Sequence, residues 1–83
     1  MKNYEIHGYT VRMTAEQASI WNAGEATAAN MAGATVSVPT RQNVAEEYDL
    51  GLVISYAANP VEGDLMETEI DRNIDGYPAN PIR

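Results

Sequence analysis

Apolar and polar side chains alternate from Asn3 to Arg12 on both sides of a His7-Gly8 pair. A two-residue turn there would place four apolar side chains on one face of a β-hairpin: Tyr4, Ile6, Tyr9 and Val11. The glycine supplies the positive φ angle that such a turn needs. The pattern therefore predicts an N-terminal hairpin with one apolar and one polar face.

The next segment changes from strand periodicity to helix periodicity. Thr14 is suited to be a helix N-cap, and Gln17 three residues later completes a capping box. Gly24 could end this helix early or lie within a longer helix that reaches about Ala32, with Gly33 as the stop. In the longer helix several apolar side chains would fall near one face: Ala18, Trp21, Ala28 and Met31.

The middle of the chain predicts a strand, a helix and a second strand. Residues 35–38 alternate as a short strand. Thr40 is expected to cap a helix over residues 41–50 that ends at Gly51. Residues 52–56 are apolar and rich in β-branched side chains, so a buried strand is expected there.

Residues 64–74 fit two geometries. As a helix, which we favour, this segment places Met66, Ile70 and Ile74 on one face and an acidic row on another: Glu67, Asp71 and Asp75. As a strand, it places Met66, Thr68 and Ile70 on one face and the acidic residues between them on the other. Either geometry is expected to expose a row of carboxylates. The tail from Gly76 onward, with two prolines, is expected to be extended.

These elements predict a single α+β domain over residues 1–83, with a small antiparallel sheet that starts at the N-terminal hairpin and two to three helices packed on one face. The composition is globular, since 45% of the residues are hydrophobic and 20% are charged. No cysteine is present, which excludes disulfides and thiolate metal sites. The longest apolar run, residues 52–58, is too short to cross a bilayer. We expect a cytoplasmic protein without a membrane partner, in a host cell if it is phage-encoded, and a monomer or small homo-oligomer.

Charge is concentrated in one stretch, called here the acidic segment (residues 46–75). It contains nine of the twelve carboxylates and only one basic residue, Arg72, so its net charge is −8 in a chain of net charge −7. Such a field repels nucleic acid and anionic membranes and attracts basic protein surfaces. We therefore expect no direct nucleic-acid binding, and a partner with a basic, nucleic-acid-binding surface.

The spacing of these carboxylates suits that kind of partner. Same-face residues lie roughly 6 Å apart on a helix and roughly 6.5–7 Å apart on a strand, similar to the phosphates along one DNA strand. The candidate partner-binding residues are the acids of this segment and one aromatic residue of the tail: Glu46, Glu47, Asp49, Asp64, Glu67, Glu69, Asp71, Asp75 and Tyr77. The alternative is an acidic face that only keeps a small protein soluble.

Metal binding and catalysis find less support in the sequence. Asp71, Asn73, Asp75 and Gly76 match the first half of an EF-hand loop, but its twelfth position holds Ile82 in place of a bidentate glutamate. A weak calcium site at Asp71, Asn73 and Asp75 is a minor alternative, and no cofactor is expected. The only histidine, His7, falls in a predicted turn, and no nucleophile motif is recognisable. We do not expect an enzyme.

In its size, acidity, single-domain organisation and lack of a catalytic motif, the chain resembles the small phage-encoded inhibitors of the anti-CRISPR type. The resemblance concerns character over the whole chain and transfers no site residue. It implies a stoichiometric inhibitor that acts by DNA mimicry on a nucleic-acid-handling complex. The alternative is a structural or accessory subunit, of a phage assembly or antitoxin kind, that binds through apolar and aromatic surface.

Overall fold

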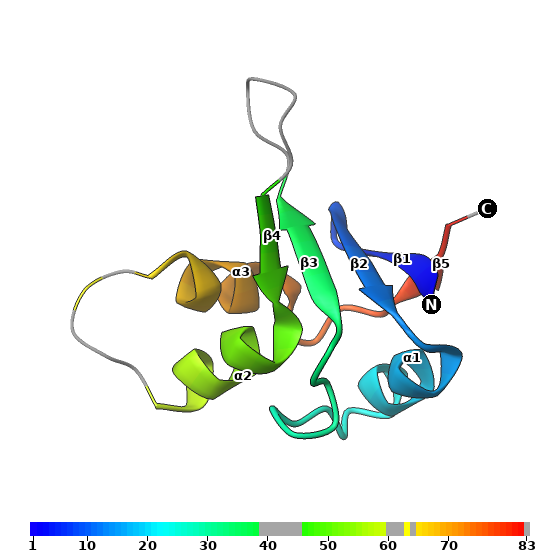
Figure 1. The fold of residues 1–83 in the computed structure, drawn as a ribbon, viewed down its shortest axis with the longest axis horizontal. Helices are drawn as coiled ribbons and strands as arrows, with labels where there is room; N and C mark the ends of the chain where they lie inside the picture. Colours follow the sequence, from blue (N-terminus) through cyan, green and yellow to red (C-terminus); the bar gives the residue numbers. More distant parts are fainter. Residues whose placement is uncertain (39–45, 60–62, 64, 83) are drawn as a thin grey trace.

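A five-stranded antiparallel sheet organises the part of the chain that the computed structural model describes, residues 1–38, 46–59, 63 and 65–82 (Figure 1). The strands lie in the order β4-β3-β2-β1-β5. The elements follow along the chain as β1 (Lys2–Ile6), β2 (Tyr9–Met13), α1 (Ala15–Asn22), β3 (Thr35–Val38), β4 (Glu46–Asp49), α2 (Leu50–Ala58), α3 (Met66–Ile74) and β5 (Asn80–Pro81). The predicted α+β class with an N-terminal hairpin is confirmed.

The hairpin has the predicted register, with Ile6 opposite Tyr9 and Tyr4 opposite Val11. His7 and Gly8 both have positive φ angles, 48° and 91°, as a tight two-residue hairpin turn requires. The alternating pattern therefore specified both the turn and the strand faces.

The first helix begins as predicted. The Thr14 hydroxyl accepts a hydrogen bond from the Gln17 backbone N–H at 3.0 Å, and the Gln17 side chain accepts one from the Thr14 N–H at 3.0 Å. α1 then ends at Asn22, and Gly24 follows with a φ of 76°, so the shorter of the two alternatives is correct. Met31 lies beyond the helix in a turn and is nevertheless fully buried.

In the middle of the chain, the strand predicted over residues 35–38 is confirmed as β3, whereas the helix over residues 41–50 and the strand over residues 52–56 are wrong where the structure describes them. The expected helix over residues 41–50 is a strand, β4, in its part from Glu46 to Asp49, and residues 39–45 with the expected Thr40 cap lie outside the described part. The expected buried strand over residues 52–56 is part of helix α2. Periodicity cannot separate a short buried helix from a buried strand, because both are apolar nearly all round.

Two contacts explain this reversal, one within the segment itself and one with a distant part of the chain. The Asp49 carboxylate accepts a hydrogen bond from the Leu52 N–H at 3.1 Å, so Asp49 caps α2 at the point where a helix was expected to end. Gly51 lies inside α2 and does not stop a helix. A Cβ atom there would lie 2.8 Å from the Ala28 carbonyl oxygen, so the glycine allows a close approach of two backbones.

The C-terminal half completes the sheet and the helical layer. Residues 66–74 form α3, which confirms the favoured helix. The extended tail pairs with β1 through β5, with Pro81 opposite Tyr4. β4 and β5 are thus the two strands of the sheet that the sequence did not predict.

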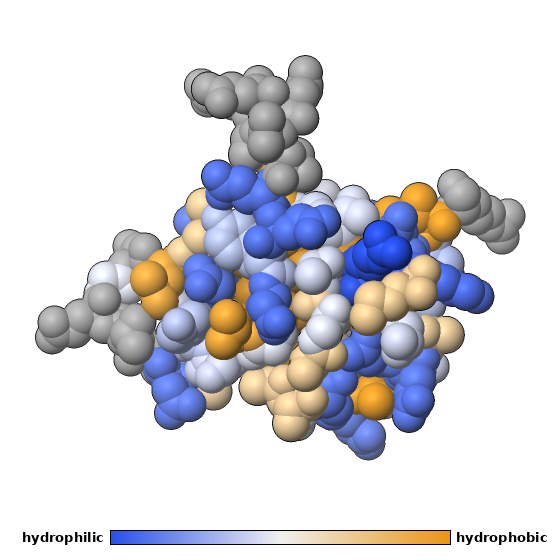
Figure 2. All heavy atoms as spheres, viewed as in Figure 1, coloured by the Kyte–Doolittle hydropathy of each residue, from blue (hydrophilic) through white to orange (hydrophobic). Residues whose placement is uncertain are grey.

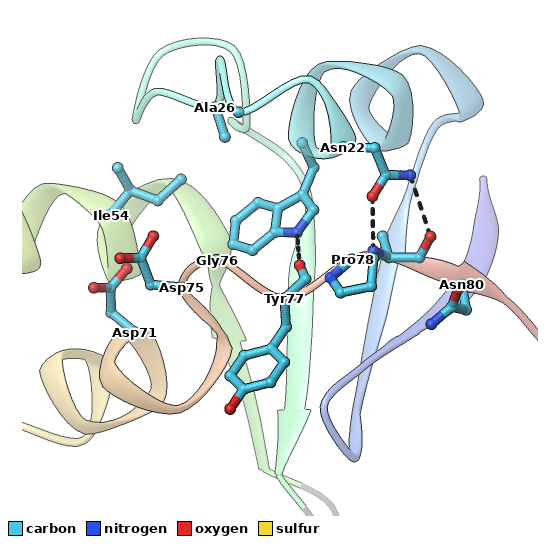
Figure 3. A pocket seen from close by; sticks show the side chains of 12 residues that line it. Asn22, Ala26, Ile54, Asp71, Asp75, Gly76, Tyr77, Pro78 and Asn80 are labelled. Atoms are coloured by element: carbon cyan, nitrogen blue, oxygen red, sulfur yellow. Dashed lines mark hydrogen bonds between the residues drawn. The ribbon is translucent and has the colours of Figure 1, made fainter.

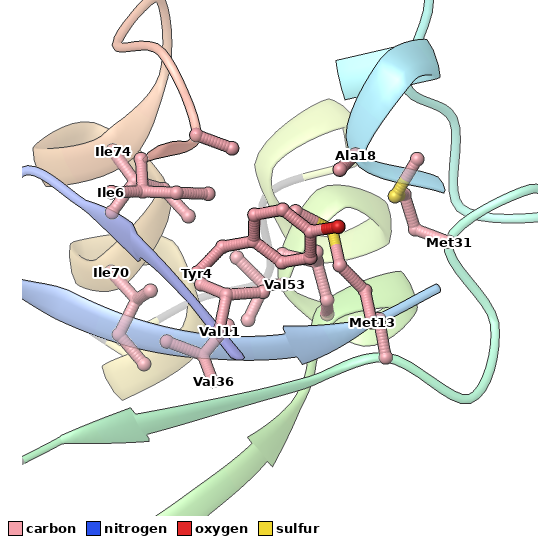
Figure 4. Close-up of a cluster of buried hydrophobic side chains, with 13 residues drawn as sticks. Tyr4, Ile6, Val11, Met13, Ala18, Met31, Val36, Val53, Ile70 and Ile74 are labelled. Atoms are coloured by element: carbon pink, nitrogen blue, oxygen red, sulfur yellow. The ribbon is translucent and has the colours of Figure 1, made fainter. Parts of the chain in front are cut away.

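The core lies between one face of the sheet and the helices (Figure 4). The sheet contributes Tyr4, Ile6, Val11, Met13 and Val36, and the helices contribute Ala18, Leu50, Val53, Ile70 and Ile74. All three helices therefore pack on the same face, as predicted. Among the described residues, no helix is long and apolar enough to cross a membrane.

Candidate functional site

The acids of β4 lie on an edge strand of the sheet. Glu46 and Glu47 are exposed and, as neighbours in a strand, point to opposite faces. Charged side chains on an edge also hinder unwanted pairing with another strand. Asp49 is exposed as well, but its carboxylate is engaged as the N-cap of α2. Within this group, Glu46 and Glu47 present the most accessible charge.

A hydrogen bond within β4 changes the acidity of Tyr48. The Tyr48 hydroxyl donates a hydrogen bond to a carboxylate oxygen of Glu46 at 2.7 Å. That hydrogen bond raises the pKa of Tyr48 above its usual value, with smaller contributions from burial and from the negative charges of Glu46 and Glu67. Glu46 therefore has the largest effect on this phenol, and Glu67 of α3 has the smallest.

The acids of α3 are exposed to different degrees. Glu69 and Asp75 are exposed, whereas Glu67 and Asp71 are half-buried. On a helical wheel the latter two lie beside the buried Ile70 and Ile74. Of the row of carboxylates expected to be exposed, Glu67, Asp71 and Asp75, only Asp75 is exposed, and the first two are half-buried.

Among the described carboxylates, Asp71 has the pKa that departs most clearly from its ordinary value. Burial raises the pKa of Asp71, and the negative charge of Asp75 raises it further. The structure thus brings together an acidic pair, Asp71 and Asp75 at the end of α3. Asp64 lies outside the described residues.

A groove of about 470 Å³ opens beside the Asp71 and Asp75 pair (Figure 3). We call it the Trp21 groove. Its walls come from the end of α1, from α2, from the end of α3 and from the segment that precedes β5. The residues that define its chemistry are Trp21, Ile54, Asp71, Asp75 and Pro78.

Hydrogen bonds from α1 fix one wall of this groove. The Trp21 indole N–H donates to the Tyr77 carbonyl oxygen at 2.8 Å. The Asn22 amide accepts from the Ala79 N–H at 2.8 Å and donates to the Ala79 carbonyl at 3.2 Å. The sequence pattern placed Trp21 on the apolar face of a helix and did not reveal the groove, because the hydrogen-bond partners of Trp21 and Asn22 lie more than fifty residues away along the chain.

Tyr77, the predicted aromatic anchor, is 44% exposed. Its ring stacks on His7 of the hairpin turn, with ring centroids 3.9 Å apart and planes 19° apart. Its backbone carbonyl is held by Trp21. Tyr77 is therefore exposed but held in place, next to the groove that it helps to line.

The calcium alternative does not have the geometry of an EF-hand loop. α3 continues through Asp71 and Asn73 to Ile74, so these side chains lie on different faces of a helix. The Asn73 amide donates a hydrogen bond to the Tyr9 hydroxyl at 3.0 Å. Within residues 1–38, 46–59, 63 and 65–82, no group of three potential metal-ligating acids, histidines or cysteines occurs.

Replacing Asp71 with asparagine is expected to stabilise the protein at neutral pH. Because the folded state raises the pKa of Asp71, it binds a proton more tightly than the unfolded chain, and stability falls as pH rises through the raised pKa. The gain of the variant should be present above that pKa and should disappear below the ordinary value of 3.8. Urea unfolding at pH 7 and pH 3 measures it. A gain that is the same at both pH values would contradict the electrostatic cause.

Comparisons with protein-family models, with curated proteins and with solved structures find no match. Function is therefore inferred from the charge of the acidic segment and from the geometry of the Trp21 groove. On the face shown in Figure 2, hydrophilic side chains are interspersed with apolar ones.

Proposed function

We propose that this chain is a non-catalytic binding protein that docks its acidic segment on a basic, nucleic-acid-binding surface of a target protein and blocks it stoichiometrically. The observation that carries the proposal is the net charge of −8 over residues 46–75. Much of that charge is accessible, since five of the seven acids that the structure describes in this segment are exposed: Glu46, Glu47, Asp49, Glu69 and Asp75.

The arrangement of the acids supports docking over an extended surface. They occupy an edge strand and a helix, and α2, which follows β4 directly, packs against α3. The two groups of acids therefore lie on elements that both contact α2. A basic groove that normally holds a nucleic-acid backbone offers lysine and arginine side chains over a similar span.

Electrostatic docking has a recognisable salt dependence. Opposite charges steer two proteins together and accelerate association, and this effect is screened by salt. The Debye length falls from about 14 Å to about 4 Å between about 0.05 and 0.5 M salt. A complex held by exposed charges should therefore weaken strongly over this range, whereas an apolar interface should change little.

Capture of partners from bacterial lysate tests the proposal. The tagged protein is expected to retain a nucleic-acid-binding protein at low salt and to lose it at high salt or when duplex DNA competes. A variant with Glu47→Lys and Glu69→Lys should lose the partner as well, because both side chains are exposed in the acidic segment. Quantitative mass spectrometry of the retained proteins measures the loss.

A matched variant separates the location of charge from its total amount. Glu16→Lys with Glu25→Lys also changes two exposed acids, and each pair of reversals moves the net charge from −7 to −3. This control should retain the partner. Equal loss in both variants, or capture that resists salt and DNA, would reject docking through the acidic segment, and the salt-resistant result would favour the accessory-subunit alternative.

A further inference from the structure

The Trp21 groove combines features that complement a cation. One part of its lining is apolar, from Trp21, Ile54 and Pro78, and another part carries the carboxylates of Asp71 and Asp75. In Figure 3 the two carboxylates lie side by side below Ile54. None of the described residues that line the groove is basic, so the negative charge there is not neutralised from within the lining.

From this groove we infer that it receives an arginine side chain of the partner protein. The inference rests on the proposed function and deepens it, because it names the partner residue that one part of the acidic segment binds. The volume of about 470 Å³ falls in the range of small-ligand pockets, so a whole side chain can enter.

Arginine fits this chemistry better than lysine. Its planar guanidinium stacks on aromatic faces, binds carboxylates through two parallel hydrogen bonds and is more weakly hydrated than an ammonium group. A lysine ammonium is compact and strongly hydrated, so it would lose more hydration on entering a half-buried site. Stacking on Trp21 and pairing with Asp71 and Asp75 would use the groove's aromatic and acidic parts together.

A bound guanidinium group would stabilise the ionised forms of Asp71 and Asp75. Burial and the charge of Asp75 raise the pKa of Asp71, so the groove's own residues disfavour two ionised carboxylates side by side. A guanidinium between them would replace this repulsion with attraction. The hydrogen bond from Trp21 to the Tyr77 carbonyl fixes the aromatic wall before the partner arrives, which reduces the ordering that binding requires.

The test titrates the protein with three short peptides that are identical except for one residue: acetyl-Gly-Arg-Gly-amide, its lysine analogue and its citrulline analogue. Trp21 is the only tryptophan, so its indole N–H gives a single resonance in a ¹H–¹⁵N NMR spectrum. The arginine peptide is expected to shift that resonance and to saturate on the order of 1 mM. The neutral citrulline peptide should cause no shift at the same concentration, and the lysine peptide should bind more weakly.

Two variants of equal net charge show where the peptide binds. Asp71→Asn with Asp75→Asn, and Glu16→Gln with Glu25→Gln, both change the net charge from −7 to −5. The first should weaken arginine-peptide binding at least about tenfold and the second less than about twofold. No shift with the arginine peptide, equal shifts with citrulline or lysine, or equal weakening in both variants would overturn the inference. The assay needs no natural partner, so its result is independent of the lysate capture that tests the proposed function.

Discussion

Replacing Ile70 with alanine is expected to lower the free energy of unfolding by about 2–5 kcal/mol. The Ile70 side chain is fully buried between α3 and the sheet, within the cluster that joins sheet and helices. Its truncation loses the transfer free energy of the removed carbons and leaves a cavity that the surrounding side chains fill only in part. A domain of 83 residues has a total stability of roughly 4–12 kcal/mol, so the variant is expected to lose a large fraction of it.

Urea unfolding followed by the fluorescence of Trp21 measures this loss. Glu69→Ala is the matched control, because Glu69 precedes Ile70 in the same helix but is exposed, and its change should stay within about 0.5 kcal/mol. Loss of less than about 1 kcal/mol in Ile70→Ala would contradict the position of α3 against the sheet.

The elements that the sequence predicted correctly are those whose signals are local. The hairpin depends on a turn pair and on alternation over ten residues, and both lie within one short stretch. The start of α1 depends on Thr14 and Gln17, which satisfy each other's backbone donors three residues apart. α3 combines helical apolar spacing at Ile70 and Ile74 with polar residues between them.

The elements that were mispredicted depend on distant partners. β4 exists because Tyr48 pairs with Val36 on the neighbouring strand, so a helical pattern in residues 46–49 yields to the sheet. Gly51 suggested a helix end, but its role is set by Ala28 and Ala32, about twenty residues earlier in the chain. The Trp21 groove likewise needs α1 and the segment before β5 to meet, which no short window of sequence shows.

The candidate acids were identified from sequence by charge alone, and the structure gives them different surroundings. Asp49 caps a helix, Glu46 binds Tyr48, and Asp71 is half-buried beside Asp75. An acid that only keeps a protein soluble needs none of these contacts. The charge of Asp71 opposes folding, and residues that reduce stability are often kept for binding or catalysis.

Replacing Gly51 with alanine is expected to destabilise the protein, although helix propensity alone predicts a gain of about 1 kcal/mol. The new Cβ atom would lie 2.8 Å from the Ala28 carbonyl oxygen and 3.0 Å from the Asp49 carboxylate oxygen that caps α2. Crowding of this kind costs about 1–3 kcal/mol, and a weakened cap adds to it. We expect a net loss of about 1–2 kcal/mol, measured by urea unfolding.

The control for Gly51→Ala is Ser55→Ala, because Ser55 lies in the same helix and is half-buried. In Ser55→Ala the free energy of unfolding should change as helix propensity predicts, with a gain of no more than about 0.7 kcal/mol. The segment that Gly51 contacts also follows Ala26, which lines the Trp21 groove, so Gly51→Ala should shift the Trp21 indole resonance while Ser55→Ala leaves it in place. A stability gain in Gly51→Ala equal to the propensity value would mean that α2 does not approach the Ala28 backbone closely. The opposite signs of the two substitutions, in one helix, would show that packing against the segment after α1 outweighs helix propensity at this position.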